Sequence, residues 1–177
     1  MDLFKSYPVG CKKVVHRTIG PTPLIHYPSG FFDGAAASNI GGAVFTLLIS
    51  DSHHFHVKMG CGANTNTRAK LMALWSLLTF ATNIGLPTLT IFGDSLVIIN
   101  WANFVASLAV LDLEHWCTRI SEAKACFLSI NFQHVYREHN RSVDGLSKEA
   151  LVLELGRLSF TEHLEGEEIG GDTLQFF

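Results

Sequence analysis

The amino-acid sequence predicts an α/β fold in which helices pack against a mixed sheet. Short apolar or alternating runs typical of strands come first, and segments with helical spacing then alternate with further short apolar runs. The chain has 177 residues and a hydrophobic content of 47%, which is enough for one domain with a sizeable core. We therefore expect one folded domain with short extensions at its ends.

Three strands are expected at the start of this domain, over 30–36, 43–50 and 53–60. The segments between them, SNIGG and SDS, consist of residues that favour turns. Strands joined by such short turns form an antiparallel meander. The proline-rich segment GPTPLIHYPSG before the meander indicates an extended lead-in over residues 1–28.

The rest of the chain is expected to alternate between helices and strands. Residues 66–84 carry apolar side chains at helical spacing, with Asn66 or Thr67 as the expected N-cap. The next expected elements are a strand over 88–92, helices over 95–104 and 111–126, a strand over 128–136 and a helix over 143–155. Residues 156–177 are rich in acidic side chains, so we expect a poorly ordered acidic tail there.

Charge and hydropathy exclude several classes of protein. The net charge of −3 and the pI of about 6.3 argue against strong nucleic-acid binding through bulk charge. No apolar run has the length of a membrane span, and MDLFKSYPVGCKK lacks the apolar region of a signal peptide. The four cysteines form no CxxC pair, which indicates reduced thiols in an intracellular protein, cytoplasmic or nuclear.

Three aspartates stand where strands end or helices begin. Asp33, Asp94 and Asp144 each close a hydrophobic run or open a helical one. Taken singly, they fit a turn, a helix N-cap and a first-turn acid, respectively. Three converging carboxylates would instead form a site of hard oxygen ligands suited to Mg²⁺ or Mn²⁺.

Four segments around these positions carry a resemblance to a known family: DGAAASNIGG, NTNTRAKLMALWSLL, FGDSLVIINW and VYREHNRSVDGLSKEAL. In this order they resemble the motifs of type 1 ribonuclease H, in particular its plant retrotransposon-associated and archaeal-like branch. The resemblance implies a ribonuclease H-like domain over residues 29–155. Its five-stranded mixed sheet would combine the three-stranded antiparallel meander with two parallel strands, with helices on both faces.

The resemblance also implies a reaction, namely cleavage of the RNA strand of an RNA–DNA hybrid with two divalent ions, Mg²⁺ or Mn²⁺. It assigns metal binding and catalysis to Asp33, Asp94 and Asp144, and proton transfer or product release to His139. Contacts with substrate, including the 2′-hydroxyls of RNA, fall to Asn39, Asn66, Thr67 and Ser95. A reverse transcriptase domain of a larger polyprotein is an expected partner.

Lys70 departs from the family, whose members carry Glu at this position. A protonated ammonium cannot ligate Mg²⁺. At about 5 Å and an effective dielectric constant near 20, the Coulomb energy of two unit charges is on the order of 3 kcal/mol. Lys70 should weaken one metal site, or form ion pairs with Asp33 and Asp94 and occupy the site itself. In both cases we expect poor cleavage or none. The segment WANFVASLAVLDLE contains no Lys or Arg, so we also expect weak intrinsic affinity for hybrid.

Two other functions stay open at this point. The chain could be a catalytically inactive module of the same fold that binds nucleic acid or protein, or another nuclease or integrase on that fold. The cluster HHFH places His54 and His56 on one strand face. No partner ligand at zinc spacing is visible in the sequence, so core or surface roles are favoured for these histidines.

Overall fold

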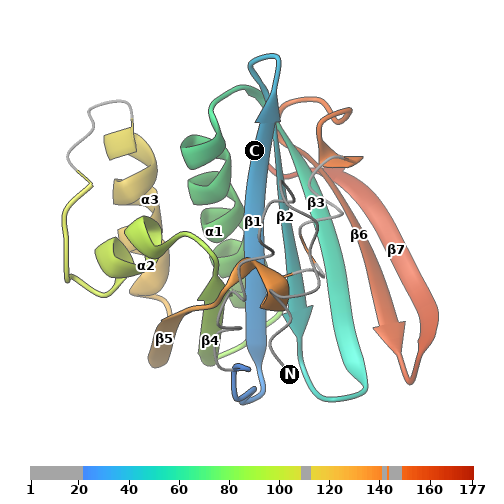
Figure 1. The fold of residues 1–177 in the computed structure, drawn as a ribbon. Helices are drawn as coiled ribbons and strands as arrows, with labels where there is room; N and C mark the ends of the chain where they lie inside the picture. The colour runs from blue at the N-terminus through green and yellow to red at the C-terminus, as the bar shows by residue number, and fades with distance from the viewer. Residues whose placement is uncertain (1–21, 109–112, 141–142, 144–148) are drawn as a thin grey trace, which may run out of the picture.

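The chain folds around one seven-stranded mixed sheet, with strand order β5-β4-β1-β2-β3-β6-β7 (Figure 1). The computed structural model describes residues 22–108, 113–140, 143 and 149–177. The strands are β1 (Ser29–Ala37), β2 (Ile40–Leu48), β3 (His53–Ala63), β4 (Thr88–Gly93), β5 (Ser129–His134), β6 (Arg157–Leu164) and β7 (Glu167–Gln175). The helices are α1 (Asn66–Asn83), α2 (Leu96–Ala102), α3 (Glu114–Lys124) and the short 3-10 helix η3 (Arg137–His139).

The predicted mixed sheet is confirmed. β1, β2 and β3 pair antiparallel in sequence order, and β4 and β5 extend the sheet in parallel with β1. Parallel pairing brings the carboxyl ends of β1 and β4 to the same edge, with Phe32 opposite Gly93. The residues that follow this register pair, Asp33 and Asp94, are therefore neighbours in space.

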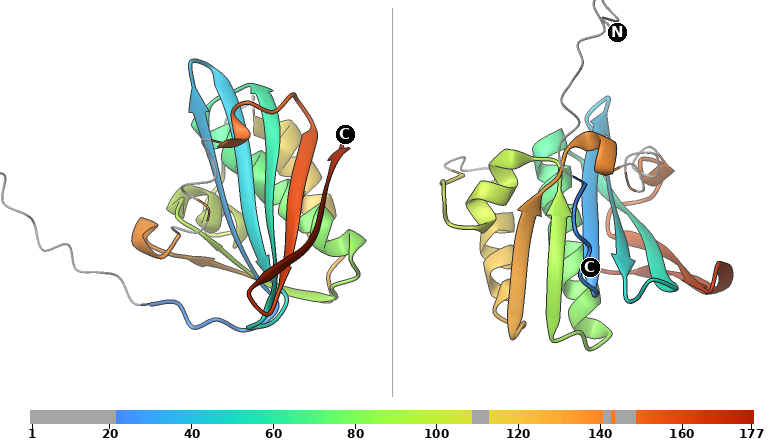
Figure 2. Two further views of the ribbon diagram at one scale, coloured as in Figure 1. Left: turned by 90° about the vertical axis from the view of Figure 1, so that its right-hand side faces the viewer. Right: turned by 60° about the horizontal axis from the view of Figure 1, so that its bottom comes forward.

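The prediction of a poorly ordered tail over 156–177 is wrong. β6 pairs antiparallel with β3, and β7 pairs with β6, so the sheet has seven strands instead of five. Leu158 on β6 is fully buried in the main core, and this apolar burial offsets the ordering of an otherwise acidic hairpin. Figure 2 shows the β6–β7 hairpin in red and orange along the edge of the sheet.

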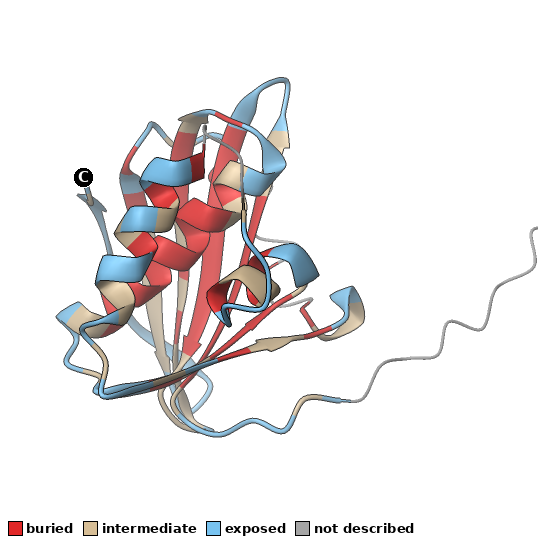
Figure 3. Cartoon of the chain, turned by 90° about the vertical axis from the view of Figure 1, so that its left-hand side faces the viewer, coloured by how far each residue is buried: buried red, intermediate tan, exposed pale blue. Residues whose placement is uncertain are grey.

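The helices α1, α2 and α3 contribute their buried side chains to one core on one face of the sheet. Figure 3 shows the buried, red side of α1 turned toward the strands. The N-cap of α1 is Thr65, one residue before the expected position, and its hydroxyl accepts a hydrogen bond from Arg68 N. α2 and α3 are shorter than predicted, while residues 109–112 lie outside the described part of the chain.

The opposite face of the sheet has its own smaller apolar cluster, in which Phe31, Val44 and Phe92 meet Val143 and Ala150. The predicted helix over 143–155 is described only in part, since residues 144–148 lie outside the described residues. Its predicted end is wrong, because residues 151–155 form a turn and an isolated bridge. Residues 143, 149 and 150 are helical, and Val143 and Ala150 pack on this face, so the described residues agree with the expectation of helices on both faces.

No helix among the described residues is long and apolar enough to cross a membrane. The lead-in is described from residue 22 onward, and it carries no helix or strand before Ser29.

Candidate active site

Asp33 is a buried carboxylate in the middle of the sheet. It lies on β1 opposite Val44 of β2, and its side chain is 6% exposed. One oxygen, Oδ1, accepts a hydrogen bond of 2.8 Å from Gly34 N. A buried ionised carboxylate needs further partners, because one hydrogen bond does not replace its lost hydration.

The partner of Asp33 comes from α1, which lies against β1 at Gly34. A Cβ atom on Gly34 would lie 2.3 Å from the backbone carbon of Ala69 and 2.4 Å from Lys70 N. Such a short distance excludes every side chain at this position. Gly34 therefore allows the first turn of α1 to touch the strand, and this contact places Lys70 beside Asp33.

Lys70 bridges Asp33 and Asp94. Its Nζ lies 3.2 Å from Asp33 Oδ1 and 3.1 Å from Asp94 Oδ1, and its side chain is only 18% exposed. Asp94, which follows β4, has a side chain that is 6% exposed. The structure thus brings together Asp33, Asp94 and Lys70, as the resemblance implies, and it aims the ammonium at the acids.

The electrostatics of this acid cluster (Asp33, Asp94 and Lys70) favour a charged lysine. Burial alone would lower the pKa of Lys70, but the charges of Asp33 and Asp94 more than offset it, so this pKa is raised. Burial raises the pKa of the Asp33 carboxyl; Lys70 lowers it, and the like charge of Asp94 raises it further. A single ammonium is shared between two carboxylates, so Asp33 is only partly compensated.

Two further residues approach Asp94 that sequence reasoning did not single out. His134 Nε2 lies 3.2 Å from the backbone oxygen of Asp94, and Arg137 Nε lies 4.0 Å from Asp94 Oδ2. Among the described residues, Asp94 Oδ2 has no hydrogen-bond partner although it is buried. The sequence signal for His134 was its place at the end of β5, because parallel pairing of β4 and β5 puts His134 opposite Gly93. Arg137 lies beyond β5, in η3, so this register does not predict its approach.

The expected substrate-contacting residues divide into two settings. Asn39 and Thr67 line a common cavity of about 700 Å³, together with Asn64, Thr65 and Arg68. Asn66 Oδ1 instead accepts a hydrogen bond of 2.7 Å from Ala36 N, which fixes the start of α1 against β1. Ser95 caps α2 by accepting from Ile98 N at 3.4 Å.

Two other expected site residues are not brought to the acid cluster by the described structure. Asp144 lies outside the described residues. His139, at the end of η3, lines a cavity with Phe31, Thr46 and the strand residues His54 and His56. A role for His139 at the acid cluster stays a prediction.

A comparison with protein families identifies the family of this chain. Residues 31–150 match the model of the family described as reverse transcriptase-like. The match covers most of the chain, so the protein belongs to this family, and its fold is that of the ribonuclease H-like superfamily. No curated protein matches the chain.

Solved structures agree with this placement. The chain is similar to RNase H1 from the halophilic archaeon Halobacterium salinarum, with 26% identity and a TM-score of 0.66 over 70% of this chain and 96% of that one. An N-terminal RNase H domain from Mycobacterium tuberculosis is 20% identical, with a TM-score of 0.62 over 70% and 94% of the chains. LC11-RNase H1, solved in complex with an RNA/DNA hybrid, is 21% identical, with a TM-score of 0.60 over 70% and 95%. The last two show the likeness of fold alone.

Proposed function

We propose that this protein is a ribonuclease H-like domain that binds RNA–DNA hybrid but cleaves it poorly or not at all. The proposal rests on one observation: Lys70 Nζ lies between Asp33 and Asp94, within 3.2 Å of an oxygen of each. In the nuclease reaction of the family, carboxylates at these places hold divalent cations. Here the cation is part of the chain itself.

The donor set as it stands does not fit a divalent ion between these two aspartates. Mg²⁺ requires oxygen ligands at about 2.0–2.1 Å in an octahedron, and an ammonium has no lone pair to offer. At about 4 Å and an effective dielectric constant near 20, an ammonium and a divalent ion repel by about 8 kcal/mol. Asp94 Oδ2 accepts no hydrogen bond among the described residues, but the guanidinium of Arg137 lies 4.0 Å from it and would also repel a divalent ion there. We therefore assign no metal-dependent step to this pair.

The surface beside the cluster supports hybrid binding. The cavity that contains Asn39 and Thr67 combines amides, hydroxyls and the Arg68 side chain with the apolar side chains of Ala63, Val97, Leu108 and Leu113. Such small polar groups suit the 2′-hydroxyls of the wide minor groove of an RNA-containing duplex. Arg137, 73% exposed next to Asp94, adds a cation for phosphate. With a net charge of −3, the affinity is expected to be modest and to fall with salt.

The test combines cleavage with binding for the wild type, Lys70→Glu and Lys70→Gln. The wild type should bind a labelled hybrid equally well with Mg²⁺ or with EDTA, and Lys70→Glu should bind better with Mg²⁺. Hybrid cleavage with Mg²⁺ or Mn²⁺ should rise at least about 100-fold in Lys70→Glu, the size of effect that single transition-state groups supply. Lys70→Gln controls for loss of the positive charge without a new carboxylate.

Two outcomes would contradict the proposal. Equal turnover by the wild type and Lys70→Glu would mean that the lysine does not block cleavage. Failure of the wild type to bind hybrid would favour a protein-interaction module of the same fold instead. We further propose that the domain acts beside a reverse transcriptase in a retrotransposon polyprotein, which the description of the matched family favours. We also propose that it acts inside the cell.

A further inference from the structure

A second cluster of polar side chains lies on the face of the sheet away from α1 and α3. His54 and His56 project from β3, and His163 projects from β6 directly opposite His54 in the register. Their rings are mutual neighbours, with centroids 4.7 Å apart for His54 and His56, 4.8 Å for His54 and His163, and 5.1 Å for His56 and His163. We call these three residues the histidine cluster.

We propose that the histidine cluster binds one divalent transition-metal ion of the zinc type. Each ring offers one nitrogen, and the three nitrogens lie within 4.8 Å of one another. Around Zn²⁺, with Zn–N bonds of about 2.1 Å, tetrahedral nitrogens lie about 3.4 Å apart. To close on an ion, the three nitrogens would approach one another by about 1.4 Å at most.

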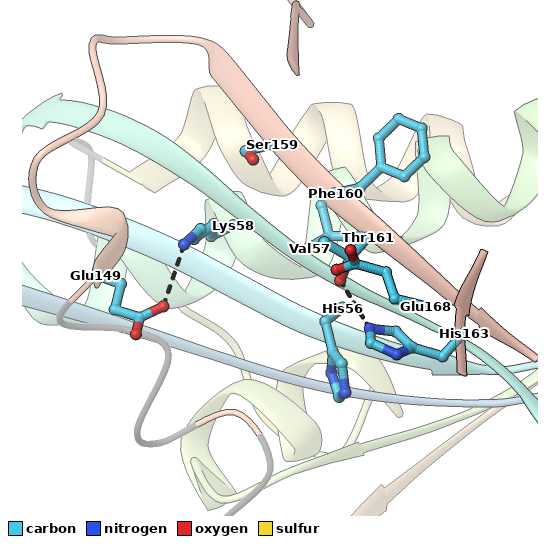
Figure 4. A pocket seen from close by; sticks show the side chains of 9 residues that line it. All are labelled: His56, Val57, Lys58, Glu149, Ser159, Phe160, Thr161, His163 and Glu168. Atoms are coloured by element: carbon cyan, nitrogen blue, oxygen red, sulfur yellow. Dashed lines mark hydrogen bonds and ion pairs between the residues drawn. The ribbon is translucent and has the colours of Figure 1, made fainter. Parts of the chain in front are cut away.

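Neighbouring threonines orient two of the rings. Thr46 Oγ1 lies 3.1 Å from His56 Nδ1, and Thr161 Oγ1 lies 3.0 Å from His163 Nε2. Figure 4 shows the His56 and His163 side chains close together, with a dashed line for the contact between Thr161 and His163. A hydrogen bond to one imidazole nitrogen leaves the other for a metal and holds the ring in place, as in known metal sites.

Electrostatics favour the form of the rings that binds metal. Burial, followed by the neighbouring histidines, lowers the pKa of His54 and of His56. Neutral imidazole is the ligand form. Among the described residues no carboxylate joins this group of ligand atoms, although Glu168 lines the cavity beside His56 and His163. Imidazole nitrogens suit zinc, nickel or copper, whereas Mg²⁺ prefers oxygen ligands, so we expect the histidine cluster to discriminate against Mg²⁺.

The surroundings leave an ion in the histidine cluster accessible. A cavity of about 380 Å³ is lined by His56 and His163, and another of about 390 Å³ by His54 and His56. Three protein ligands with an open fourth position are typical of zinc sites that bind a water or a further molecule. His163 also lies beyond residue 150, where the family match ends. The site therefore depends on the C-terminal hairpin and is independent of the proposed hybrid binding.

The experiment uses the full chain without a polyhistidine tag, stripped with EDTA and titrated with Zn²⁺ by calorimetry. We expect one ion per chain at micromolar concentration, unaffected by excess Mg²⁺. His54→Gln and His163→Gln should each lower the affinity about ten-fold or more, the range seen even for partners of metal ligands. His53→Gln is the matched control, because His53 shares β3 but pairs with Glu162 at 2.6 Å, and it should bind like the wild type.

A stability readout serves as a second measurement. A metal that bridges β3 and β6 binds only the folded chain, so saturating Zn²⁺ should raise the melting temperature by about 5 °C or more. The rise should vanish in His163→Gln. The wild type with Co²⁺ gives a third readout, since nitrogen ligation in a tetrahedral site changes its visible spectrum. Absence of 1:1 binding in the wild type, or an equal loss of affinity in His53→Gln, would overturn the proposal.

Discussion

The acid cluster and the histidine cluster are built on the same sheet but differ in what compensates their side chains. In the acid cluster, two buried carboxylates lie next to each other, and Lys70 Nζ compensates both from within the chain. In the histidine cluster, three bases lie within reach of one another, and no side chain of the cluster supplies a cation. Like-charged or electron-rich groups gather in a fold only where something positive can join them.

The difference teaches where to look for a metal in this protein. Homology points to the acid cluster, but its cation position is filled by an ammonium. Geometry points to the histidine cluster, which includes a residue outside the family match.

The largest effect is expected from removal of the internal cation. Lys70→Ala leaves Asp33 and Asp94 buried and uncompensated, which should lower the free energy of unfolding by about 3–5 kcal/mol. Urea denaturation measures it. The control is Lys58→Ala, because Lys58 pairs with Glu149 at 3.1 Å in an exposed setting, and such pairs contribute about 1 kcal/mol or less. Similar losses in both variants would show that Lys70 is an ordinary surface lysine.

The next effect tests whether the hairpin that carries His163 is part of the core. Leu158 is fully buried against the main core, so Leu158→Ala should cost about 3 kcal/mol. Leu174 on β7, 37% exposed, is the matched control, and its replacement by Ala should cost less than about 1 kcal/mol. If Leu158→Ala left the free energy of unfolding unchanged, residues 156–177 would not be packed against the core. His163 would then not be held beside His54 and His56.

A somewhat smaller loss is expected where β1 and α1 touch. Gly34→Ala forces a Cβ against the backbone of Ala69 and Lys70, and overpacking of this kind costs about 1–3 kcal/mol. Gly170→Ala is the control, since nothing lies within 4 Å of its Cβ position. Thermal denaturation compares the two. If Gly34→Ala melts like the wild type, α1 does not lie as close to the strand as described, and neither does Lys70 to Asp33.

The smallest effect concerns Cys61, a buried residue on β3, the strand that also carries His54 and His56. Burial raises the pKa of the Cys61 thiol from 9.0 to about 12. A raised pKa means that the folded state favours the neutral thiol, so this stability is complete below pH 9.0 and is lost as the pH rises toward 12. By pH 10 the loss should be about 1 kcal/mol. The contribution of the thiol is the difference between the wild type and Cys61→Ala in how the free energy of unfolding changes with pH. The same pH dependence in both would contradict the prediction.

Much of the fold was predictable because its signals are local. Alternation and turn residues revealed the meander of β1, β2 and β3, and helical spacing revealed α1. The C-terminal hairpin was missed because its residues are largely polar, and its identity as strands depends on pairing with β3 across the fold. β-structure of this kind is decided by its neighbours more than by propensity.

The candidate site was predictable to the same degree. The positions of Asp33 and Asp94 at neighbouring strand ends followed from sequence motifs and parallel pairing. The approach of Arg137 to Asp94 did not, because it depends on how the chain turns after β5. The sequence left two options for Lys70, a weakened metal site or ion pairs with Asp33 and Asp94. The position of its Nζ favours the ion pairs.

The sequence alone determined which residues carry charge and in which local elements they stand. It contained the three aspartates, the lysine at position 70 and the histidine pair on one strand face, because these features depend on identity and local periodicity. The tertiary structure alone decided that Lys70 Nζ reaches two carboxylates and that His163 meets His54 and His56. Both are contacts between distant segments, set by strand register and by the approach of α1 to β1, and no local pattern encodes them.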